Sequence, residues 1–241
     1  MTRSRSVTLF IVALALLLAL AAVAPTLAGA APLNHTRFGT ATTSTNWSGY
    51  DATGGGFASV AATWTVPTVK PSLTDAYSSF WVGLDGDGSG TVEQLGTDSD
   101  SVGGAAVYEV WYEMYPHWPK YVAMTIKPGD TMTASVTAAA SGAFTLSITD
   151  KTTGQSFTVT EKMKRAKRYS AEVIAEAPWS GGVLPLANFG SVGFTGCTFN
   201  AKPIRAFNWN KIDMVENGVT KDVTGPLDNT GTAFTITWKH L

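Results

Sequence analysis

Short runs in which apolar and polar residues alternate make up most of the chain beyond its first 45 residues. The runs are rich in Val, Thr, Phe, Tyr and Trp, and Gly, Asp, Asn and Pro separate them, which is the pattern of β-strands joined by turns. No segment outside the N-terminus keeps the apolar period that indicates a helix. This pattern predicts an all-β fold, an antiparallel β-sandwich or jelly roll of two packed sheets. Strands are expected at 59–66, 77–84, 107–114, 121–127, 131–138, 143–149, 156–160, 171–177, 191–194, 204–209 and 233–238.

The N-terminus has the features of a secretory signal peptide at residues 1–30. Arg3 and Arg5 precede an apolar run at 7–23, and Ala28-Gly29-Ala30 provides a cleavage site of small residues. Residues 31–45 are polar and rich in Thr, so we expect an N-terminal arm or a short pro-segment there, followed by one domain at 46–241. The protein is accordingly predicted to be secreted and extracellular, with no membrane attachment after signal cleavage.

The composition excludes several classes of function. The chain has a net charge of −1, which gives no electrostatic basis for a nucleic-acid partner. Cys197 is the only cysteine, so no intrachain disulfide can form and apolar burial must stabilise the fold. The histidines do not form an H-E-x-x-H zinc motif, and no G-x-S-x-G motif is present. The remaining chemistry is that of carboxylates, amides and water, with no metal and no other cofactor.

Alternate residues of a strand point to opposite faces of its sheet, and here the two faces differ. In 108–115, Tyr108, Val110, Tyr112 and Met114 share an apolar face. The opposite face of such strands mixes acids, an amide and aromatic side chains, namely Trp81 and Asp85, Gln94 and Asp98, Glu109, Trp111, Glu113 and Tyr115, and Glu172 and Glu176. We interpret this face as an exposed groove for an extended peptide or a polysaccharide, because tryptophan is unfavourable on a solvated face without a ligand.

The stretch 81–98, WVGLDGDGSGTVEQLGTD, resembles a calcium-binding EF-hand loop at first sight. Counted from Asp85, the twelfth position of the loop, which requires a bidentate Glu, is Gly96, and the flanks lack the helices that the motif needs. We therefore interpret it as a tight hairpin that brings Trp81 and Asp85 beside Gln94 and Asp98.

Six segments, in order along the chain, carry a resemblance to the glutamic peptidases, the eqolisin or G1 family formerly grouped as A4. They are NWSGY at 46–50, ASVAATWTVP at 58–67, FWVGLDGD at 80–87, QLGTD at 94–98, YEVWYEMYP at 108–116 and SAEVIAEAP at 170–178. The resemblance implies a concanavalin-like sandwich of two antiparallel sheets and a secreted, acid-active, metal-independent endopeptidase. It also implies a monomer that acts on protein or peptide substrates.

The resemblance assigns a catalytic pair, Gln94 and Glu176. Glu176 would be the general base and acid, and the Gln94 amide would stabilise the oxyanion. Substrate-binding or supporting roles would fall to Trp47, Trp81, Asp85, Asp98, Trp111, Glu113 and Tyr115. Asp98 could instead cap a turn, as aspartates often do.

Two other functions stay open from the residues alone. A jelly-roll glycoside hydrolase could use Glu109 and Glu113 as its two carboxylates, and a non-catalytic sandwich could bind carbohydrate. A basic cluster precedes the strand of Glu176 and is either a solvated loop or the edge of a groove that favours acidic peptides; its members are Lys162, Lys164, Arg165, Lys167 and Arg168.

Overall fold

The computed structural model describes residues 41–241. The predicted signal peptide at 1–30, and the part of the predicted arm before Ala41, lie outside the described residues. Within residues 41–241, no helix is long and apolar enough to cross a membrane.

The described chain is almost entirely β-structure, which confirms the predicted fold class. Its only helical segment within residues 41–241 is a short 3₁₀-helix, η1 (Ile204–Ala206). The strands are β1 (Ala41–Ser44), β2 (Trp47–Thr53), β3 (Ser59–Thr65), β4 (Ser79–Asp85), β5 (Val92–Val102), β6 (Ala105–Tyr115), β7 (Lys120–Val122), β8 (Thr131–Ala138), β9 (Ala143–Asp150), β10 (Ser156–Lys162), β11 (Ser170–Glu176), β12 (Ser191–Phe199), β13 (Lys202–Pro203), β14 (Trp209–Glu216), β15 (Val219–Thr224) and β16 (Phe234–Trp238).

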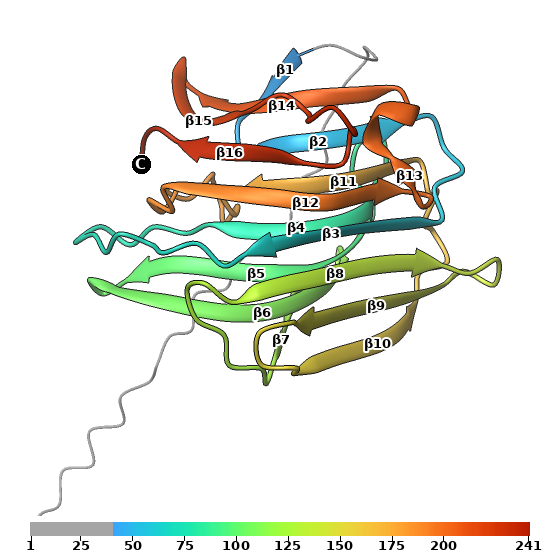
Figure 1. Cartoon of the computed structure of the whole chain (residues 1–241), viewed down its shortest axis with the longest axis horizontal. Helices are drawn as coiled ribbons and strands as arrows, with labels where there is room; N and C mark the ends of the chain where they lie inside the picture. Colours follow the sequence, from blue (N-terminus) through green and yellow to red (C-terminus); the bar gives the residue numbers. More distant parts are fainter. Residues whose placement is uncertain (1–40) are drawn as a thin grey trace, which may run out of the picture.

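These strands form a sandwich of two layers (Figure 1). One layer has the order β10-β9-β8-β3-β12-β16, the other has the order β14-β2-β11-β4-β5-β6-β7, and β15 joins β16 to β14. Strands that are not hydrogen-bonded neighbours, such as β4 and β8 or β11 and β3, come together across the sandwich. The strand pairs are antiparallel, except that β1 runs parallel to β14.

The main hydrophobic core lies between the layers and follows the predicted alternation. In β6 the side chains of Val110, Tyr112 and Met114 belong to this core, whereas Trp111 belongs to a separate cluster. Cys197 is buried in the core as a free thiol, which fits its interpretation as a small apolar residue. The faces predicted from strand parity are therefore the faces that the fold uses.

Two expected strands are wrong in whole or in part. Ile204 begins a 3₁₀ turn and Phe207 follows its end, and both pack in the core because residues three apart lie on one side of such a turn; the next strand starts only at Trp209. The strand expected at 121–127 ends at Val122, although Met124 and Ile126 still alternate into the core. At both places the alternation of apolar residues correctly predicts which side chains are buried. It does not predict whether the backbone pairs with a neighbouring strand.

The alternation pattern does not predict β2, β13, β14 or β15, and the predicted domain begins after β1. Lys211, Asp213 and Asp222 interrupt the apolar pattern of β14 and β15. Ala41–Ser44, part of the predicted arm, forms β1 and pairs with β14. The sheet therefore includes residues that precede the predicted domain.

Candidate active site

The candidate site lies on β2, β11, β4, β5 and β6, which are consecutive neighbours in one layer. We call the face of these strands that points away from the other layer the outer face. Trp47, Trp81 and Trp111 pack there with Ile174 in a hydrophobic cluster separate from the core, and Tyr115 packs against this cluster. The rings of Trp47 and Trp81 meet edge to face with centroids 5.0 Å apart. The structure thus brings together the aromatic residues predicted for the site.

Two glycines make room for the Trp81 indole between its neighbours. Trp81 is paired with Gly96 of β5, and Gly83 is paired with Gln94. A Cβ atom at Gly83 would lie 2.8 Å from the Trp81 ring, and one at Gly96 would lie 2.2 Å from the Phe80 carbonyl oxygen and 2.6 Å from the Trp81 Cβ. Gly83 therefore leaves space for the indole, and the glycine of the QLGTD segment allows β5 to approach the backbone of β4 at Trp81.

Glu176, the last residue of β11, holds its carboxylate between two donors. Oε2 accepts a hydrogen bond from Trp81 Nε1 at 2.9 Å, and Oε1 accepts one from Asn46 Nδ2 at 3.2 Å. Burial raises the pKa of Glu176 well above the usual value, and the charge of Glu113 raises it further, while the indoles of Trp81 and Trp47 oppose this. The carboxyl group is thus fixed in orientation and sensitive to its acidic neighbours.

Gln94 and Glu113 face each other across β5 and β6. The two residues are paired in register, and Gln94 Nε2 donates a hydrogen bond of 2.6 Å to Glu113 Oε2. Among the described residues, Gln94 Oε1 receives no hydrogen bond, although the side chain is fully buried. Glu113 therefore links the two predicted catalytic residues, because it bonds Gln94 and acts electrostatically on Glu176.

Asp98 lies in the middle of β5, so it does not cap a turn. Its Oδ1 accepts a hydrogen bond of 2.6 Å from Ser79 Oγ on β4. Burial raises the pKa of Asp98 to about 7, the Ser79 hydroxyl and the Trp111 indole lower it, and Glu109 raises it. Asp98 also contributes to the raised pKa of Glu176, which places its charge in the same electrostatic cluster.

Comparison with known proteins identifies the family to which this architecture belongs. A family model described as the Peptidase A4 family matches residues 45–237. The chain belongs to the peptidase A4 family. The chain is 32% identical over 177 residues to aspergillopepsin-2 of Aspergillus niger, an alignment covering 63% of each chain. It is 34% identical over 128 residues to scytalidopepsin B of Scytalidium lignicola, which covers 52% of this chain and 48% of that one.

Solved structures of the family share the fold. Scytalido-glutamic peptidase, crystallised with a peptide-based transition-state analogue, superposes with a TM-score of 0.70 at 27% identity, covering 82% of this chain and all of that one. Aspergilloglutamic peptidase from Aspergillus niger superposes with a TM-score of 0.59 at 30% identity, covering 68% of this chain and 99% of that one. The chain spans between about half and two thirds of the length of the two curated relatives.

Asp85 is the predicted site residue that does not contact the Gln94 and Glu176 group. Its carboxylate accepts hydrogen bonds of 2.8 Å from the backbone N–H groups of Arg168 and Tyr169. It therefore anchors the end of the basic cluster beside the hairpin of β4 and β5. The same hairpin resembled a calcium loop in sequence, and within residues 41–241 no group of three or more His, Cys, Asp or Glu is arranged to hold a metal ion.

The outer face of this peptidase A4 member is not the exposed groove that the sequence analysis expected. Trp47, Trp81 and Gln94 are fully buried, Glu176 is 3% exposed and Trp111 is 6% exposed. The indoles pack on one another there, and the Glu176 carboxylate and the Gln94 amide are hydrogen-bonded to neighbouring side chains. Alternation distinguishes two faces, but it does not distinguish a solvated face from a face buried by such contacts.

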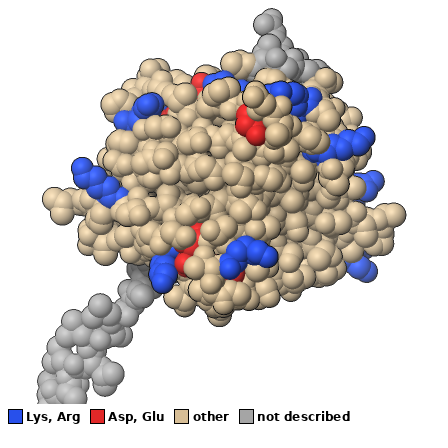
Figure 2. Space-filling model, viewed as in Figure 1, with Lys and Arg blue, Asp and Glu red and all other residues tan. Residues whose placement is uncertain are grey.

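The charged residues of the chain are divided between its interior and its surface. Twelve of the 18 acidic residues are buried, namely Asp51, Asp85, Asp87, Glu93, Asp98, Asp100, Glu113, Asp130, Asp150, Glu172, Glu176 and Asp222. Among the described Lys and Arg residues, Lys221 alone is buried. Figure 2 shows one face of the molecule, on which basic side chains outnumber acidic ones.

The two carboxylates of the alternative glycoside hydrolase are poorly spaced for that reaction. Glu109 and Glu113 lie four residues apart on β6, which separates their Cα atoms by roughly 13 Å along an extended strand. Glycosidase carboxyl groups lie about 5–9.5 Å apart on either side of the scissile bond. Glu113 is moreover engaged with Gln94.

Sequence reasoning missed Asn46, which touches Glu176 directly. Asn46-Trp-Ser also fits the N-glycosylation pattern, but the Asn46 side chain is 3% exposed and its amide is hydrogen-bonded inside the protein. No sequence signal indicates this contact, because it depends on the register that pairs Trp47, the next residue, with Glu176 on β11.

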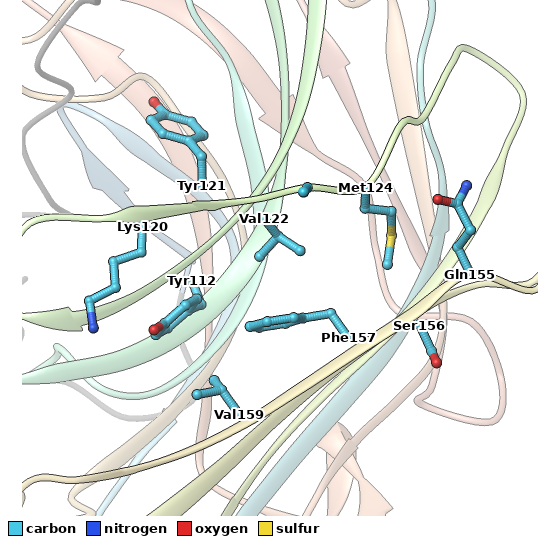
Figure 3. A pocket seen from close by; sticks show the side chains of 10 residues that line it. Tyr112, Lys120, Tyr121, Val122, Met124, Gln155, Ser156, Phe157 and Val159 are labelled. Carbon is cyan, nitrogen blue, oxygen red and sulfur yellow. The ribbon is translucent and has the colours of Figure 1, made fainter.

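A cavity of about 650 Å³ lies away from this site, between the β6–β7 side and β10 (Figure 3). Tyr112, Val122, Met124, Phe157 and Val159 line its apolar part. None of the predicted site residues lines it. It opens where the two end strands of the sheet path, β7 and β10, leave the sandwich unclosed.

Proposed function

We propose that this protein is a secreted, acid-active endopeptidase that hydrolyses peptide bonds with Gln94 and Glu176. One observation carries the proposal. Gln94 and Glu176 belong to different strands, and Glu113 links them because it accepts a hydrogen bond from the Gln94 amide and its charge acts on the Glu176 carboxylate. An amide and a carboxyl group that share such a neighbour can hold one water molecule between them.

In the proposed reaction, ionised Glu176 takes a proton from this water, and the water oxygen attacks the scissile carbonyl. Gln94 has two amide hydrogens, of which Glu113 uses one, so the other is available to donate to the oxyanion. Gln94 Oε1 receives no hydrogen bond from the described residues and can accept one from the attacking water. Glu176 then returns its proton to the leaving amine.

The carboxyl neighbours make the ionisation of Glu176 sensitive to pH. Burial and then the charge of Glu113 raise the pKa of Glu176, while the indoles of Trp81 and Trp47 lower it. Only the ionised carboxylate can act as the base, so kcat/KM is expected to fall on the acidic side as Glu176 becomes protonated. The acidic limb of the pH profile therefore reports the ionisation of Glu176.

A substrate panel tests the function. The secreted protein is incubated at pH 3–6 with denatured casein and, separately, with β-glucans, with and without EDTA and pepstatin. We expect casein to be cleaved with and without each inhibitor. EDTA should have no effect because Gln94 and Glu176 need no metal, and pepstatin should have none because they are not an aspartate pair. Sugar release without proteolysis would support a glycosidase, and binding without turnover would support a carbohydrate-binding sandwich.

A further inference from the structure

We propose that Asn46 is a positioning residue that holds the Glu176 carboxylate in its reactive orientation, acting through Glu176 and not on the substrate. The inference rests on the proposed role of Glu176 and extends it to a residue to which no role has been assigned. It also gives a function to β1, because the segment that begins with this strand fixes Asn46.

The backbone first brings the two residues into register. Trp47, which follows Asn46, is paired with Glu176, and the N–H of Ala177 donates a hydrogen bond of 2.8 Å to the carbonyl of Asn46. Asn46 therefore lies beside the end of β11, and its side chain reaches Oε1 of Glu176 at 3.2 Å. With Trp81 on Oε2, each carboxylate oxygen has one fixed donor, which sets the plane of the group.

Ser44 determines which way the Asn46 amide points. The Ser44 hydroxyl donates to Asn46 Oδ1 at 3.3 Å and accepts the backbone N–H groups of Asn46 and Trp47 at 3.3 and 3.1 Å. Because Oδ1 receives this proton, the NH₂ group is directed at Glu176. Ser44 is the last residue of β1 and is paired with Met214 of β14, so the anchor belongs to the sheet.

The electrostatic setting makes a neutral donor effective. The acidic groups that act on Glu176 are Glu113 from β6 and Asp98 from β5, and both disfavour its ionised form. The largest influences on the pKa of Glu176 within the described chain include no Lys or Arg. Hydrogen bonds from the Asn46 amide and the Trp81 indole are therefore the contacts that favour the ionised carboxylate.

The test is the pH profile of kcat/KM for Asn46→Ala in the full-length secreted protein. Without the donor, the pKa of Glu176 rises, so we expect the acidic limb to move to higher pH by about one unit, with about a tenfold loss on that limb. Asn210→Ala is the matched control, since Asn210 is also buried and donates to a buried carboxylate, Asp51, at 2.8 Å. The control is expected to lower Tm without moving the acidic limb.

Two further variants keep the proposal testable if Asn46→Ala folds poorly. Asn46→Asp can donate a proton to Glu176 only while it is protonated, so we expect activity close to wild type at the lowest pH and a falling alkaline limb. Ser44→Ala leaves the amide in place but unanchored and should shift the acidic limb in the same direction by less.

An acidic limb that is unchanged in all three variants, or equal losses at every pH, would overturn the positioning role. The variant Glu176→Gln distinguishes a wrong role for Asn46 from a wrong proposed function. If Glu176→Gln is inactive and the acidic limb does not move in the Asn46 and Ser44 variants, only the role of Asn46 is wrong. If Glu176→Gln is fully active, the catalytic assignment itself is wrong.

Discussion

The two glutamates of β11 lie on the same face and have opposite surroundings. Glu176 has a donor on each oxygen, Trp81 and Asn46. Glu172 is fully buried, and neither of its oxygens has a hydrogen-bond partner among the described residues. Burial raises the pKa of Glu172 well above the usual value, and the charges of Asp51, Asp85 and Asp87 add to it.

The difference shows what separates a reactive carboxyl group from a structural one on a shared face. In register, Glu172 is the closer of the two to Gln94, since both are paired with Gly83, whereas Glu176 is paired with Ser79. Proximity along the sheet would thus favour Glu172. Burial raises the pKa of both glutamates, but hydrogen-bond donors favour Glu176, because they stabilise the ionised form that a general base requires.

The largest effect is expected from exchanging the two glutamates for glutamine separately. Glu176→Gln removes the base and should lower kcat/KM by at least about 10³-fold, as removal of a group that transfers protons commonly does. Glu172→Gln keeps the shape of a group that is protonated at acid pH and should leave kcat/KM within about threefold of wild type. Peptide hydrolysis at pH 3–6, with Tm as a check on folding, measures both. An inactive, folded Glu172→Gln together with an active Glu176→Gln would reverse the assignment.

The second-largest effect is expected at Gln94, the proposed catalytic partner of Glu176. Gln94→Ala removes the proposed oxyanion donor, and we expect kcat to fall by about 10²–10³ with a smaller change in KM. Gln155→Ala is the control, because Gln155 is an exposed glutamine that donates to the carbonyl of Thr125. Single-turnover rates on a chromogenic peptide distinguish them. A loss confined to KM would mean that Gln94 binds substrate without stabilising the oxyanion.

These contrasts show which parts of the candidate site can be predicted from the sequence. The apolar alternation identified the outer face and its members, since parity follows from strand geometry alone. The resemblance in the QLGTD and SAEVIAEAP segments singled out Gln94 and Glu176. The contacts of Asn46 and Asp85 were not predictable, because each depends on a segment distant in sequence, Asn46 on the end of β11 and Asp85 on the backbone at Arg168. Strand pairing in three dimensions, which alternation does not encode, decides such contacts.

A third, smaller effect is on stability, which the buried acids make dependent on pH. Burial raises the pKa of Asp222, on β15 and away from the site, to about 8, and the Ser48 hydroxyl lowers it in part. A group whose pKa is raised by folding stabilises the protein fully below its unfolded value, near 4, and this stability is lost as the pH rises towards about 8. We expect Tm to fall from pH 4 to pH 8.

Asp222→Asn keeps the shape of the group and removes its titration. The fall in Tm between pH 4 and pH 8 should shrink by roughly 5–10 °C, while kcat/KM at acid pH stays unchanged. Glu172→Gln should reduce the fall in the same sense, and thermal unfolding followed by circular dichroism measures both. A fall in Tm that is identical in wild type and both variants would mean that these carboxyl groups are not protonated in the fold.

The smallest effect is expected at the surface beside the Glu172 end of the outer face. Asp85 holds the backbone of Arg168 and Tyr169 there, while Lys164, Arg165 and Lys167 of the basic cluster are exposed. If this cluster attracts acidic peptides, Lys164→Glu with Arg165→Glu should lower kcat/KM for an acidic peptide by about two- to fivefold at low salt, and the difference should vanish near 1 M salt because exposed charges are screened. A neutral peptide of equal length is the control and should respond to neither change. Equal kcat/KM values for both peptides at all salt concentrations would make the cluster a solvated loop, and specificity would then belong to the buried contacts around Glu176.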